Sequence, residues 1–377
     1  MTELNQHLDN GLFISCLALF SLTILIQLYY IFFIFRRLAF YKTIDVFDEE
    51  IPLSIIIASR NDGEALQENL KYILNQKYSM FEVIVVNNNS IDNSKHVLSE
   101  LEKEYNHLKV VEFNNGKHMR PGKKLPLTIG IKAAKNKHLI FTDADCRPAS
   151  QLWLKTMAQG FSNMEEVILG YGPYHKTNGI LNAIIRYDTA WIGMNYFSFA
   201  LSKKPYMGVG RNLAYTKEAY LSVDGFKSHH SLASGDDDLF IQEVSKTSTL
   251  GIQIDPKSFC FSQSKKTYSD WINQKSRHYS TSTKYGFIKK LLLAIYPASL
   301  ILAWFSFVSL MIVGNAPFIF ITIMSLFYLL KWLIQGRCLF KLNERSFAFL
   351  FPFWDLFYSV LSPLIFIIGK TKRNNNW

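Results

Sequence analysis

Apolar residues are concentrated at the two ends of this 377-residue chain, whereas its middle alternates short apolar runs with polar, helix-forming stretches. Residues 11–35 carry no charge. A helix of that length reaches ~37 Å, enough to cross a hydrocarbon core of ~30 Å. Arg36, Arg37 and Lys42 follow this run, and no basic residue precedes it. By the positive-inside rule, we expect the next domain to be cytoplasmic.

Two apolar runs near the other end, 291–313 and 318–330, are separated by the turn-forming segment 314–317. Lysines and arginines flank the pair on both sides. This predicts a hairpin that enters and leaves the membrane from the cytoplasm. The second run is short for a span unless the ammonium group of Lys331 reaches the interface and residues 332–334 extend the run.

Segment 347–368 contains Pro352, Asp355 and Pro363 and precedes a basic tail. These residues favour a re-entrant or interfacial hairpin, with a fourth span as the alternative. The apolar pattern therefore predicts three regions. They are an amino-terminal membrane anchor (1–40), a globular domain (41–290) and a carboxyl-terminal membrane region (291–377). The last region comprises a hairpin (291–335), the re-entrant or spanning segment (347–369) and the basic tail.

The globular domain repeats a strand pattern and a helix pattern. Four short runs are rich in β-branched residues and apolar without alternation, which is typical of strands buried on both faces. They are residues 53–58, 83–86, 109–113 and 138–142. Helical patterns lie between them, at 64–75, 92–105 and 123–135. This alternation predicts an α/β fold with a doubly wound, mostly parallel sheet, in which ligands bind at the carboxyl ends of the strands.

Polar residues directly follow the predicted strands. Residues 59–62 and 87–90 follow the first two, and Asp143-Ala144-Asp145 follows the fourth. Two carboxylates one residue apart at a strand end can bind Mg²⁺ or Mn²⁺, hard cations that bridge phosphate oxygens. Alternatively, they cap the next helix. Neither the dinucleotide-binding Gly-x-Gly-x-x-Gly motif nor a P-loop occurs, which disfavours dehydrogenases and P-loop ATPases.

Net charge and cysteine content further restrict the possible binding partners and the cellular compartment. The net charge of +11 fits nucleic acid, anionic lipid or an anionic small substrate as a partner. No basic stripe with interleaved aromatic residues occurs, so we expect no nucleic-acid binding. The four cysteines are far apart and form no CxxC pair. This disfavours a zinc site and a disulfide framework and fits a reducing compartment.

Six short segments together resemble the family 2 glycosyltransferases. They are, in chain order, SIIIASRN (54–61), VIVVNNNS (83–90), GKK (122–124), DAD (143–145), GDDD (235–238) and QKSRH (274–278). The chain is similar in particular to membrane-bound members such as ceramide glucosyltransferase and the cellulose and hyaluronan synthase-like enzymes. The resemblance implies the GT-A fold for the globular domain, with transmembrane helices on both sides of it.

The resemblance also implies roles for individual residues. Asp237, with Asp236 beside it, corresponds to the catalytic base, and Asp145 with Asp143 to the metal ligands. The residues implied in binding the nucleotide sugar are Ala58, Ser59, Asn87, Lys123, Asp143, Arg211, Gln274 and Arg277. Two departures stand out. Residues 87–89 are Asn where the family usually has acidic residues, and His278 replaces a tryptophan.

These roles imply an inverting glycosyltransferase of the inner membrane. Its donor would be a nucleotide-diphosphate sugar, with UDP as the leading nucleotide, and its acceptor a lipid or glycan at the cytoplasmic face. A divalent cation and basic side chains would stabilise the charge that develops on the diphosphate, and a carboxylate would take the acceptor's proton. A processive polysaccharide synthase and a non-catalytic membrane scaffold of the same fold are the alternatives.

Each motif also has a purely structural interpretation. The acidic triplet 236–238 could simply begin a helix, since Asp favours helix amino termini. The basic pair 123–124 could form a plain helix face, segment 208–212 an ordinary turn, and residues 277–278 a basic flank that contacts lipid. Three adjacent carboxylates in a catalytic site should instead raise the pKa of at least one of them by like-charge repulsion.

Overall fold

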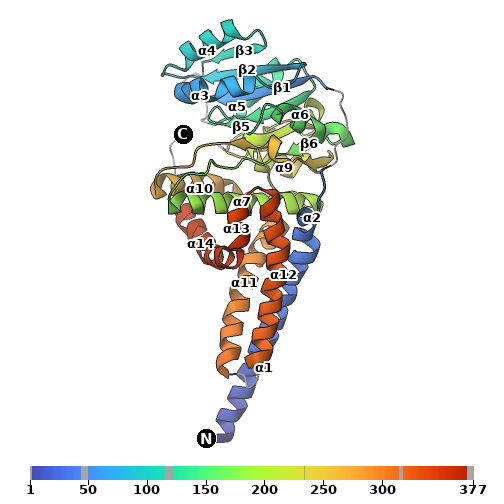
Figure 1. The fold of residues 1–377 in the computed structure, drawn as a ribbon, viewed down its shortest axis with the longest axis vertical. Coiled ribbons are helices and arrows are strands. Elements are labelled where there is room, and N and C mark those ends of the chain that lie inside the picture. Colours follow the sequence, from blue (N-terminus) through green and yellow to red (C-terminus); the bar gives the residue numbers. More distant parts are fainter. Residues whose placement is uncertain (1, 44–49, 115–121, 233, 314–316, 372–377) are drawn as a thin grey trace. The chain divides into compact units, whose positions relative to one another are not determined.

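The computed structural model describes residues 2–43, 50–114, 122–232, 234–313 and 317–371. The chain divides into two compact units. The helical unit consists of Met1–Tyr41 and Tyr285–Ile368, and the sheet unit of Lys42–Lys284 with Gly369–Trp377. Long helices thus come from both ends of the chain and α/β layers from its middle (Figure 1).

The sheet unit is built on a seven-stranded sheet with the order β3-β2-β1-β4-β7-β6-β8. Its strands are β1 (Leu53–Ser59), β2 (Phe81–Asn88), β3 (Leu108–Phe113), β4 (His138–Thr142), β6 (Val167–Leu169), β7 (Leu213–Thr216) and β8 (Leu250–Ile252). β3, β2, β1 and β4 run parallel, whereas β7 runs antiparallel to β4 and β6. The four strands predicted from the sequence are confirmed, and they form a continuous parallel block in the sheet; β6 and β8 also pair in parallel at the other edge.

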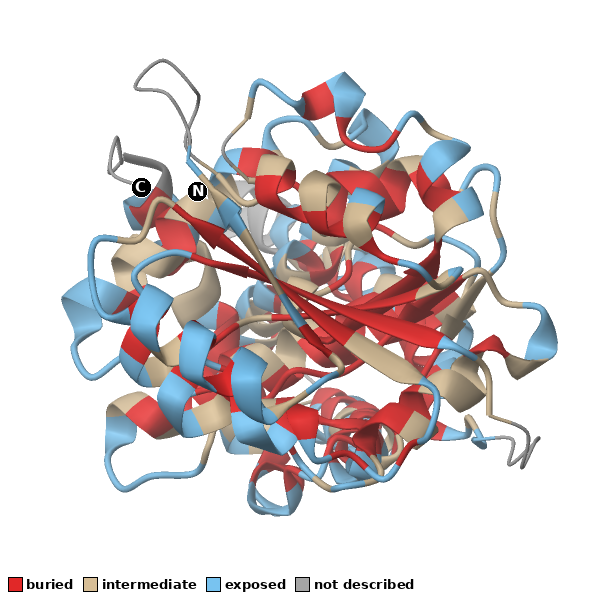
Figure 2. Ribbon diagram, turned by 90° about the horizontal axis from the view of Figure 1, so that it is seen from above, coloured by how far each residue is buried: buried red, intermediate tan, exposed pale blue. Residues whose placement is uncertain are grey.

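Helices cover both faces of the parallel strands, so every residue of β1 is buried. Helices α3 (Gly63–Leu74), α4 (Ser94–Glu104) and α5 (Lys124–Ala133) alternate with β1 to β4 along the chain. A side chain at Gly130 of α5 would approach Ile56 Cγ2 to 2.6 Å, so α5 packs directly on β1. Figure 2 shows the buried strands between helices whose outer faces are exposed. This burial of apolar surface drives the folding of the unit.

The reversed direction of β7 brings two distant parts of the chain to one edge. Phe141 of β4 pairs with Leu213 of β7, so the residues before β7 lie beside the residues that follow β4. The turn Gly210–Asn212 occupies this position, and the Thr142 hydroxyl donates a hydrogen bond to the Arg211 carbonyl at 3.0 Å. Residues that precede β7 therefore lie at the same edge of the sheet as the residues that follow β4.

Further elements complete the sheet unit. They are α6 (Trp153–Ala158), α7 (Ile180–Leu201), α8 (Lys217–Leu221), α9 (Asp238–Val244), α10 (Tyr268–Ser282) and a two-stranded sheet of β5 (Arg147–Pro148) and β9 (Cys260–Phe261). The β5–β9 pairing ties the segment after Asp145 to the segment that leads into α10.

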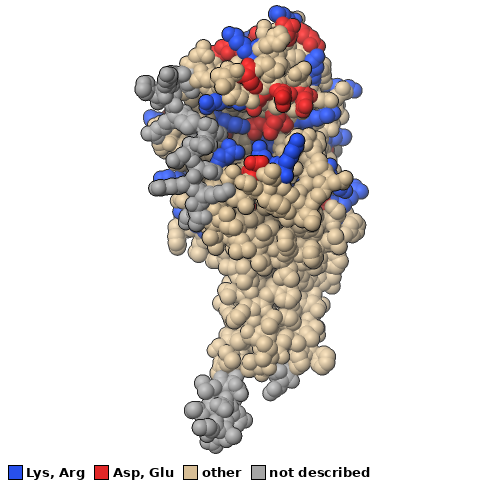
Figure 3. All heavy atoms as spheres, turned by 90° about the vertical axis from the view of Figure 1, so that its left-hand side faces the viewer, with Lys and Arg blue, Asp and Glu red and all other residues tan. Residues whose placement is uncertain are grey.

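The helical unit is built from helices at both ends of the chain. They are α1 (Thr2–Tyr29), continued by a π-helical turn (Tyr30–Phe35) and α2 (Arg36–Ala39), then α11 (Phe287–Val313), α12 (Pro317–Lys341), α13 (Arg345–Phe349) and α14 (Phe351–Thr371). Among the described residues, four segments are long and apolar enough to cross a membrane, namely Gly11–Ala39, Phe287–Val313, Pro317–Lys341 and Phe351–Gly369. In Figure 1, α1, α11 and α12 run side by side, and in Figure 3 their surface carries few charged side chains.

Buried polar side chains join these helices. Gln27 Nε2 of α1 donates to the Tyr296 carbonyl and to Ser299 Oγ of α11, both at 2.8 Å. Gln335 Nε2 of α12 donates to the Tyr296 hydroxyl at 2.7 Å. Each bond satisfies a polar group that would otherwise be buried without a partner, so the three bonds fix which faces of α1, α11 and α12 meet.

Two details of the helical unit differ from expectation. Lys331 does not reach an interface, because its side chain is fully buried and its Nζ lies 2.5 Å from Asp355 Oδ2 of α14. α12 nevertheless continues through residues 332–334 to Lys341, so it has the length of a span although Lys331 does not reach an interface. Segment 347–368 does not form a hairpin, since α14 is one helix that includes Pro363. Whether α14 spans the bilayer or lies at its surface stays a prediction.

Candidate active site

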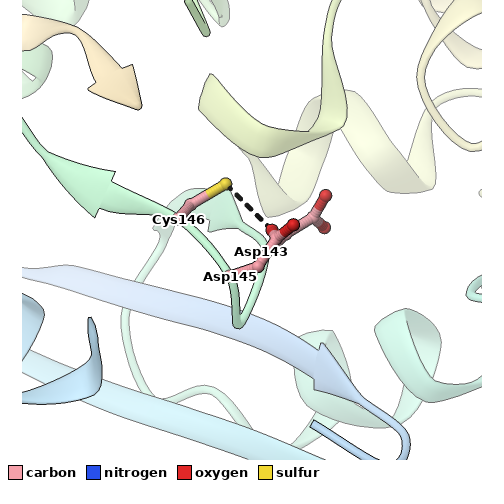
Figure 4. A group of neighbouring side chains, drawn as sticks. All are labelled: Asp143, Asp145 and Cys146. Atoms are coloured by element: carbon pink, nitrogen blue, oxygen red, sulfur yellow. Dashed lines mark hydrogen bonds between the residues drawn. The ribbon is translucent and has the colours of Figure 1, made fainter. Parts of the chain in front are cut away.

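Asp143 and Asp145 lie directly after β4, at the carboxyl edge of the parallel strands. One ligand atom each from Asp143, Asp145 and Cys146 lies within 4.8 Å of the others (Figure 4). Asp145 is exposed and Asp143 half-buried, whereas the Cys146 thiol is buried, which raises its pKa. The two carboxylates therefore offer oxygen ligands that suit a hard cation, and the thiol stays protonated.

Lys123 is joined to the first of these aspartates. Its Nζ lies 2.6 Å from Asp143 Oδ1, and both side chains are about one-third exposed, at 38% and 33%. Burial alone would raise the pKa of Asp143, but the charge and hydrogen bond of Lys123 lower it, with a further contribution from Arg211. Burial alone would lower the pKa of Lys123, but the charge of Asp143 raises it, and the charges of Asp236 and Asp145 add to the rise. Lys123 is thus paired with an acidic residue and is not part of a plain basic face.

Lys124 faces a different partner. Its side chain is buried, and its Nζ donates to the His229 carbonyl at 2.6 Å and the Leu232 carbonyl at 3.1 Å. Burial lowers the pKa of Lys124, while the charges of Asp236 and Asp238 oppose that change. Two adjacent lysines at the start of α5 therefore hold the Asp143–Asp145 turn and the chain that leads to the acidic triplet.

The acidic triplet does begin a helix, as its structural interpretation predicts. Asp237 is the N-cap of α9: its Oδ1 accepts from the Asp238 amide at 2.8 Å and its Oδ2 from the Gly210 amide at 3.2 Å. Burial raises the pKa of Asp237 to about 8, and the charges of Asp236 and Asp238 add to the rise. The pKa of Asp236 is raised too. Like-charge repulsion within the triplet thus adds to a rise in the pKa of Asp237 whose largest cause is burial.

The third member of the triplet has a structural contact. Asp238 is buried, and its Oδ2 accepts a hydrogen bond from the Thr281 hydroxyl of α10. Its Oδ1 accepts from the Leu239 amide at 2.8 Å. Asp238 therefore connects α9 to α10, which is a structural role.

Arg211 lies beside the Asp143–Asp145 turn. Its guanidinium donates to the Gly172 carbonyl through Nε at 2.7 Å and also through Nη2, and it lies 4.6 Å from the centre of the Tyr174 ring. The Tyr174 hydroxyl also accepts from Gln274 Nε2 of α10 at 3.1 Å. Tyr174 thereby links two of the predicted donor-binding residues, Arg211 and Gln274.

Asn212, the neighbour of Arg211, is fully occupied by the fold. Its Nδ2 donates to the carbonyls of Tyr171 and Ser258, both at 2.8 Å, and its Oδ1 accepts from Trp153 Nε1 at 3.1 Å. The side chain is completely buried. Segment 208–212 therefore combines one structural residue with one site residue.

His278 has an electrostatic connection to the Asp143–Asp145 motif. Surrounding protein atoms and the positive charges of Lys275 and Arg211 lower the pKa of His278, and His278 contributes to the lowered pKa of Asp143. The His278 side chain reaches solvent, whereas Arg277 is half-buried one residue earlier on α10. The residue that departs from the family motif thus belongs to the site.

The predicted nucleobase-binding residues lie at the carboxyl ends of β1 and β2. Ser59 is in register with Asn87, and Asn87 with Glu112 of β3. Asn87 Nδ2 donates to both Glu112 oxygens at 3.1 Å. Ala58 and Ser59 are buried next to this pair. A group of residues at two neighbouring strand ends is therefore present, as the sequence predicts.

Asp62 connects the nucleobase side to the acidic motif and is missing from the predicted set. Its Oδ2 accepts from the Arg60 amide at 2.9 Å. Burial raises the pKa of Asp62, and its carboxylate also responds to the charges of Lys123 and Asp145. The signal available in the sequence was its place after β1, in the same position relative to its strand as the other polar residues. In Figure 3, acidic side chains gather on one face of the sheet unit with basic ones beside them.

The fold and this arrangement of charges define a GT-A-type α/β domain with an acidic strand-end motif. Solved structures agree on the fold: the mannosyltransferase PcManGT from Pyrobaculum calidifontis, in complex with GDP-Man and Mn²⁺, superposes with a TM-score of 0.56. The superposition covers 94% of this chain and 99% of that one at 15% identity.

Sequence comparisons specify the family. The model for glycosyl transferase family 2 matches residues 54–219, and that for glycosyl transferase family group 2 matches residues 138–336, more than half of the chain. The chain therefore belongs to the family 2 glycosyltransferases.

Two relatives show how far the likeness extends. The β-monoglucosyldiacylglycerol synthase of Nostoc sp. (strain PCC 7120 / SAG 25.82 / UTEX 2576) is 34% identical over 108 residues, which are 27% of this chain and 22% of that protein. The probable glycosyltransferase YdaM of Bacillus subtilis (strain 168) is 24% identical over 286 residues, 72% of this chain and 66% of that protein. The match thus spans about a fifth of the first relative's length.

Proposed function

We propose that the protein transfers a sugar from a nucleotide-diphosphate donor, with UDP as the leading nucleotide, to a lipid or lipid-linked glycan at the cytoplasmic face of the inner membrane. The observation that carries the proposal is the grouping of Lys123, Asp143 and Asp145 with the acidic triplet across one site. The name of the Nostoc relative, a glucosyldiacylglycerol synthase, supports a lipid acceptor. The GDP-Man and Mn²⁺ bound to PcManGT support a nucleotide sugar and a divalent cation.

Asp145 and Asp143 would hold Mg²⁺ or Mn²⁺. Both are carboxylates, the lowered pKa of Asp143 keeps it ionised, and Asp145 is open to solvent. When bound, the cation would neutralise charge on the diphosphate leaving group. Lys123, adjacent to Asp143, would add a second positive charge at the same place.

The remaining predicted residues would bind the donor at two places. Ala58, Ser59 and Asn87 at the ends of β1 and β2 would contact the base and ribose. Arg211, Gln274 and Arg277 would contact the diphosphate and the sugar, since Arg211 and Gln274 already share the Tyr174 hydroxyl. Cationic donors at the diphosphate act where negative charge develops in the transition state.

Asp237 would be the general base, with Asp236 beside it. A carboxylate with a pKa of about 8 is a stronger base than an ordinary aspartate, so it accepts a hydroxyl proton more readily. Removal of that proton lets the acceptor oxygen attack the anomeric carbon on the side opposite the diphosphate. The reaction would then invert the configuration in one displacement.

The division of the chain into an anchor (1–40), a catalytic domain (41–290) and a membrane region (291–377) is part of the same proposal. Basic residues at 36, 37 and 42, and at 284, 289 and 290, flank the catalytic domain. The positive-inside rule assigns such flanks to the cytoplasm, where nucleotide sugars are available.

The test is sugar transfer by the detergent-solubilised full chain over a panel of sugar nucleotides, with and without Mn²⁺ or Mg²⁺. We expect turnover that requires a cation and is lost in Asp145→Ala and Asp237→Asn. Asp224→Asn is the matched control, because Asp224 is exposed and Asn tolerates its positive φ of 55°. Turnover that survives either site substitution contradicts the assignment, and product length separates single addition from polymerisation.

A further inference from the structure

A buried ion pair outside the predicted site joins α7 to α10. Lys275 Nζ of α10 lies 2.8 Å from Asp188 Oδ1 and 2.9 Å from Asp188 Oδ2 of α7. Both side chains are only 4% exposed. Burying two charges costs free energy, so the pair is more readily explained by a specific structural role than by a gain in stability.

Lys275 stands inside the motif that supplies Gln274 and Arg277, but it is not available to a ligand. Both carboxylate oxygens of Asp188 already contact its ammonium group, and the Tyr279 ring lies 5.2 Å from the same nitrogen. With 4% of its side chain exposed, Lys275 cannot present its charge to a diphosphate in the site. Although Lys275 lies within a predicted binding motif, we therefore expect its role to be structural.

The helical period separates the two roles of α10. Trp271, Lys275 and Tyr279 are spaced by four residues and share one side of the helix, where Trp271 and Lys275 are buried. Gln274, His278 and Thr281 fall about 100° away on the next side. That side carries the hydrogen bonds to Tyr174 and to Asp238 and the charge contact with Asp143.

We infer that Asp188 is a positioning residue for the glycosyl-transfer site: through Lys275 it fixes the rotation and height of α10, and so places Gln274 and His278 against Arg211, Tyr174 and Asp143. The pair suits this task because loss of either partner leaves an unpaired buried charge, which α10 must shift to expose to solvent. This inference rests on the proposed function for its catalytic consequence, and on the α7–α10 contact for its structural one.

The experiment compares Asp188→Asn, Lys275→Met and the double variant Asp188→Leu/Lys275→Met in the detergent-solubilised full chain. Each single variant leaves one charge buried without its partner and lets α10 shift. We expect kcat/KM for the sugar nucleotide to fall by about 10- to 100-fold, as for other small misplacements of binding groups. We also expect faster hydrogen exchange of residues 268–282. The double variant restores apolar packing and should recover to within about threefold of the natural chain.

Controls separate the possible failures. Lys71→Met breaks an exposed ion pair with Glu104 and should change neither readout. Unchanged exchange and kinetics in the single variants would overturn the positioning role. A double variant that remains inactive with normal exchange would also overturn it, because Lys275 would then act on the donor itself. If the natural chain transfers no sugar, the proposed function fails, while the exchange data still decide whether Asp188 holds α10.

Discussion

Burial and two neighbouring carboxylates raise the pKa of Asp237 to about 8. Below that pH most Asp237 side chains are protonated and cannot accept a proton. We therefore expect kcat/KM to rise about tenfold per pH unit up to pH 8 and then to level off. The measurement is a pH–rate profile between pH 6 and 9.5 at a fixed cation concentration.

The same profile for Asp238→Asn provides a second check. This change removes one of the negative charges that raise the pKa of Asp237, so the limb should move to lower pH. The side-chain carbonyl oxygen of Asn at position 238 can still accept a hydrogen bond from the Thr281 hydroxyl, which preserves the link to α10. A natural profile that is flat from pH 6 to pH 8 would mean that Asp237 is not the titrating base.

At the scale of the elements, the Asn212 side chain joins α6, the segment after β6 and the segment before β9. Asn212→Ala removes two donors from buried carbonyls and the acceptor of Trp153 Nε1. We expect a loss of about 2–4 kcal/mol in the free energy of unfolding. Thermal unfolding followed by tryptophan fluorescence measures it as a lower midpoint.

Asn69→Ala is the comparison for that substitution. Asn69 is half-buried on α3, and its Nδ2 bonds only to the Ala65 carbonyl of the same helix at 2.9 Å. Alanine also has the higher helix propensity, so little stability should be lost. Equal midpoints for Asn212→Ala and the natural chain would show that the Asn212 bonds add nothing to the fold.

The elements also show how far the sequence could be interpreted. β1 to β4 and the aspartates after β4 were predictable, because unbroken β-branched runs identify buried parallel strands. β6, β7 and β8 have only three or four residues each, too few for a pattern. The position of Arg211 depends on the antiparallel direction of β7, so a search for polar residues after strands could not find it, and the family resemblance did. The partners of Lys124, Lys275 and Lys331 are distant in sequence and became visible only in three dimensions.

At the scale of the whole molecule, the buried Lys331–Asp355 pair makes the helical unit dependent on both partners. Lys331→Met leaves Asp355 unpaired, and we expect a loss of about 3–5 kcal/mol. The double variant Lys331→Met/Asp355→Leu should be close to the natural chain in stability. Size-exclusion chromatography after heating measures the fraction that stays monodisperse. Single variants that resist heating as well as the natural chain would show that the pair is dispensable.

Topology is a prediction for the complete chain. With a cytoplasmic catalytic domain and a hairpin of α11 and α12, a surface-lying α14 keeps the carboxyl terminus in the cytoplasm. We expect a carboxyl-terminal green fluorescent protein fusion to fluoresce and an alkaline phosphatase fusion to be inactive. An active phosphatase would show that α14 crosses the bilayer. Fusions after position 42 report the catalytic domain itself and serve as the reference.

The Lys331–Asp355 pair has a consequence for biogenesis. A lone lysine inside the hydrocarbon costs up to about 2.5–3.5 kcal/mol on the scale of translocon insertion. Lys331 meets its carboxylate only after 24 more residues have been synthesised. α12 is therefore synthesised with an unpaired charge, and we expect it to insert stably in the membrane only after α14 has been synthesised. Nascent chains arrested before residue 355 would accordingly be early targets of membrane quality-control proteases.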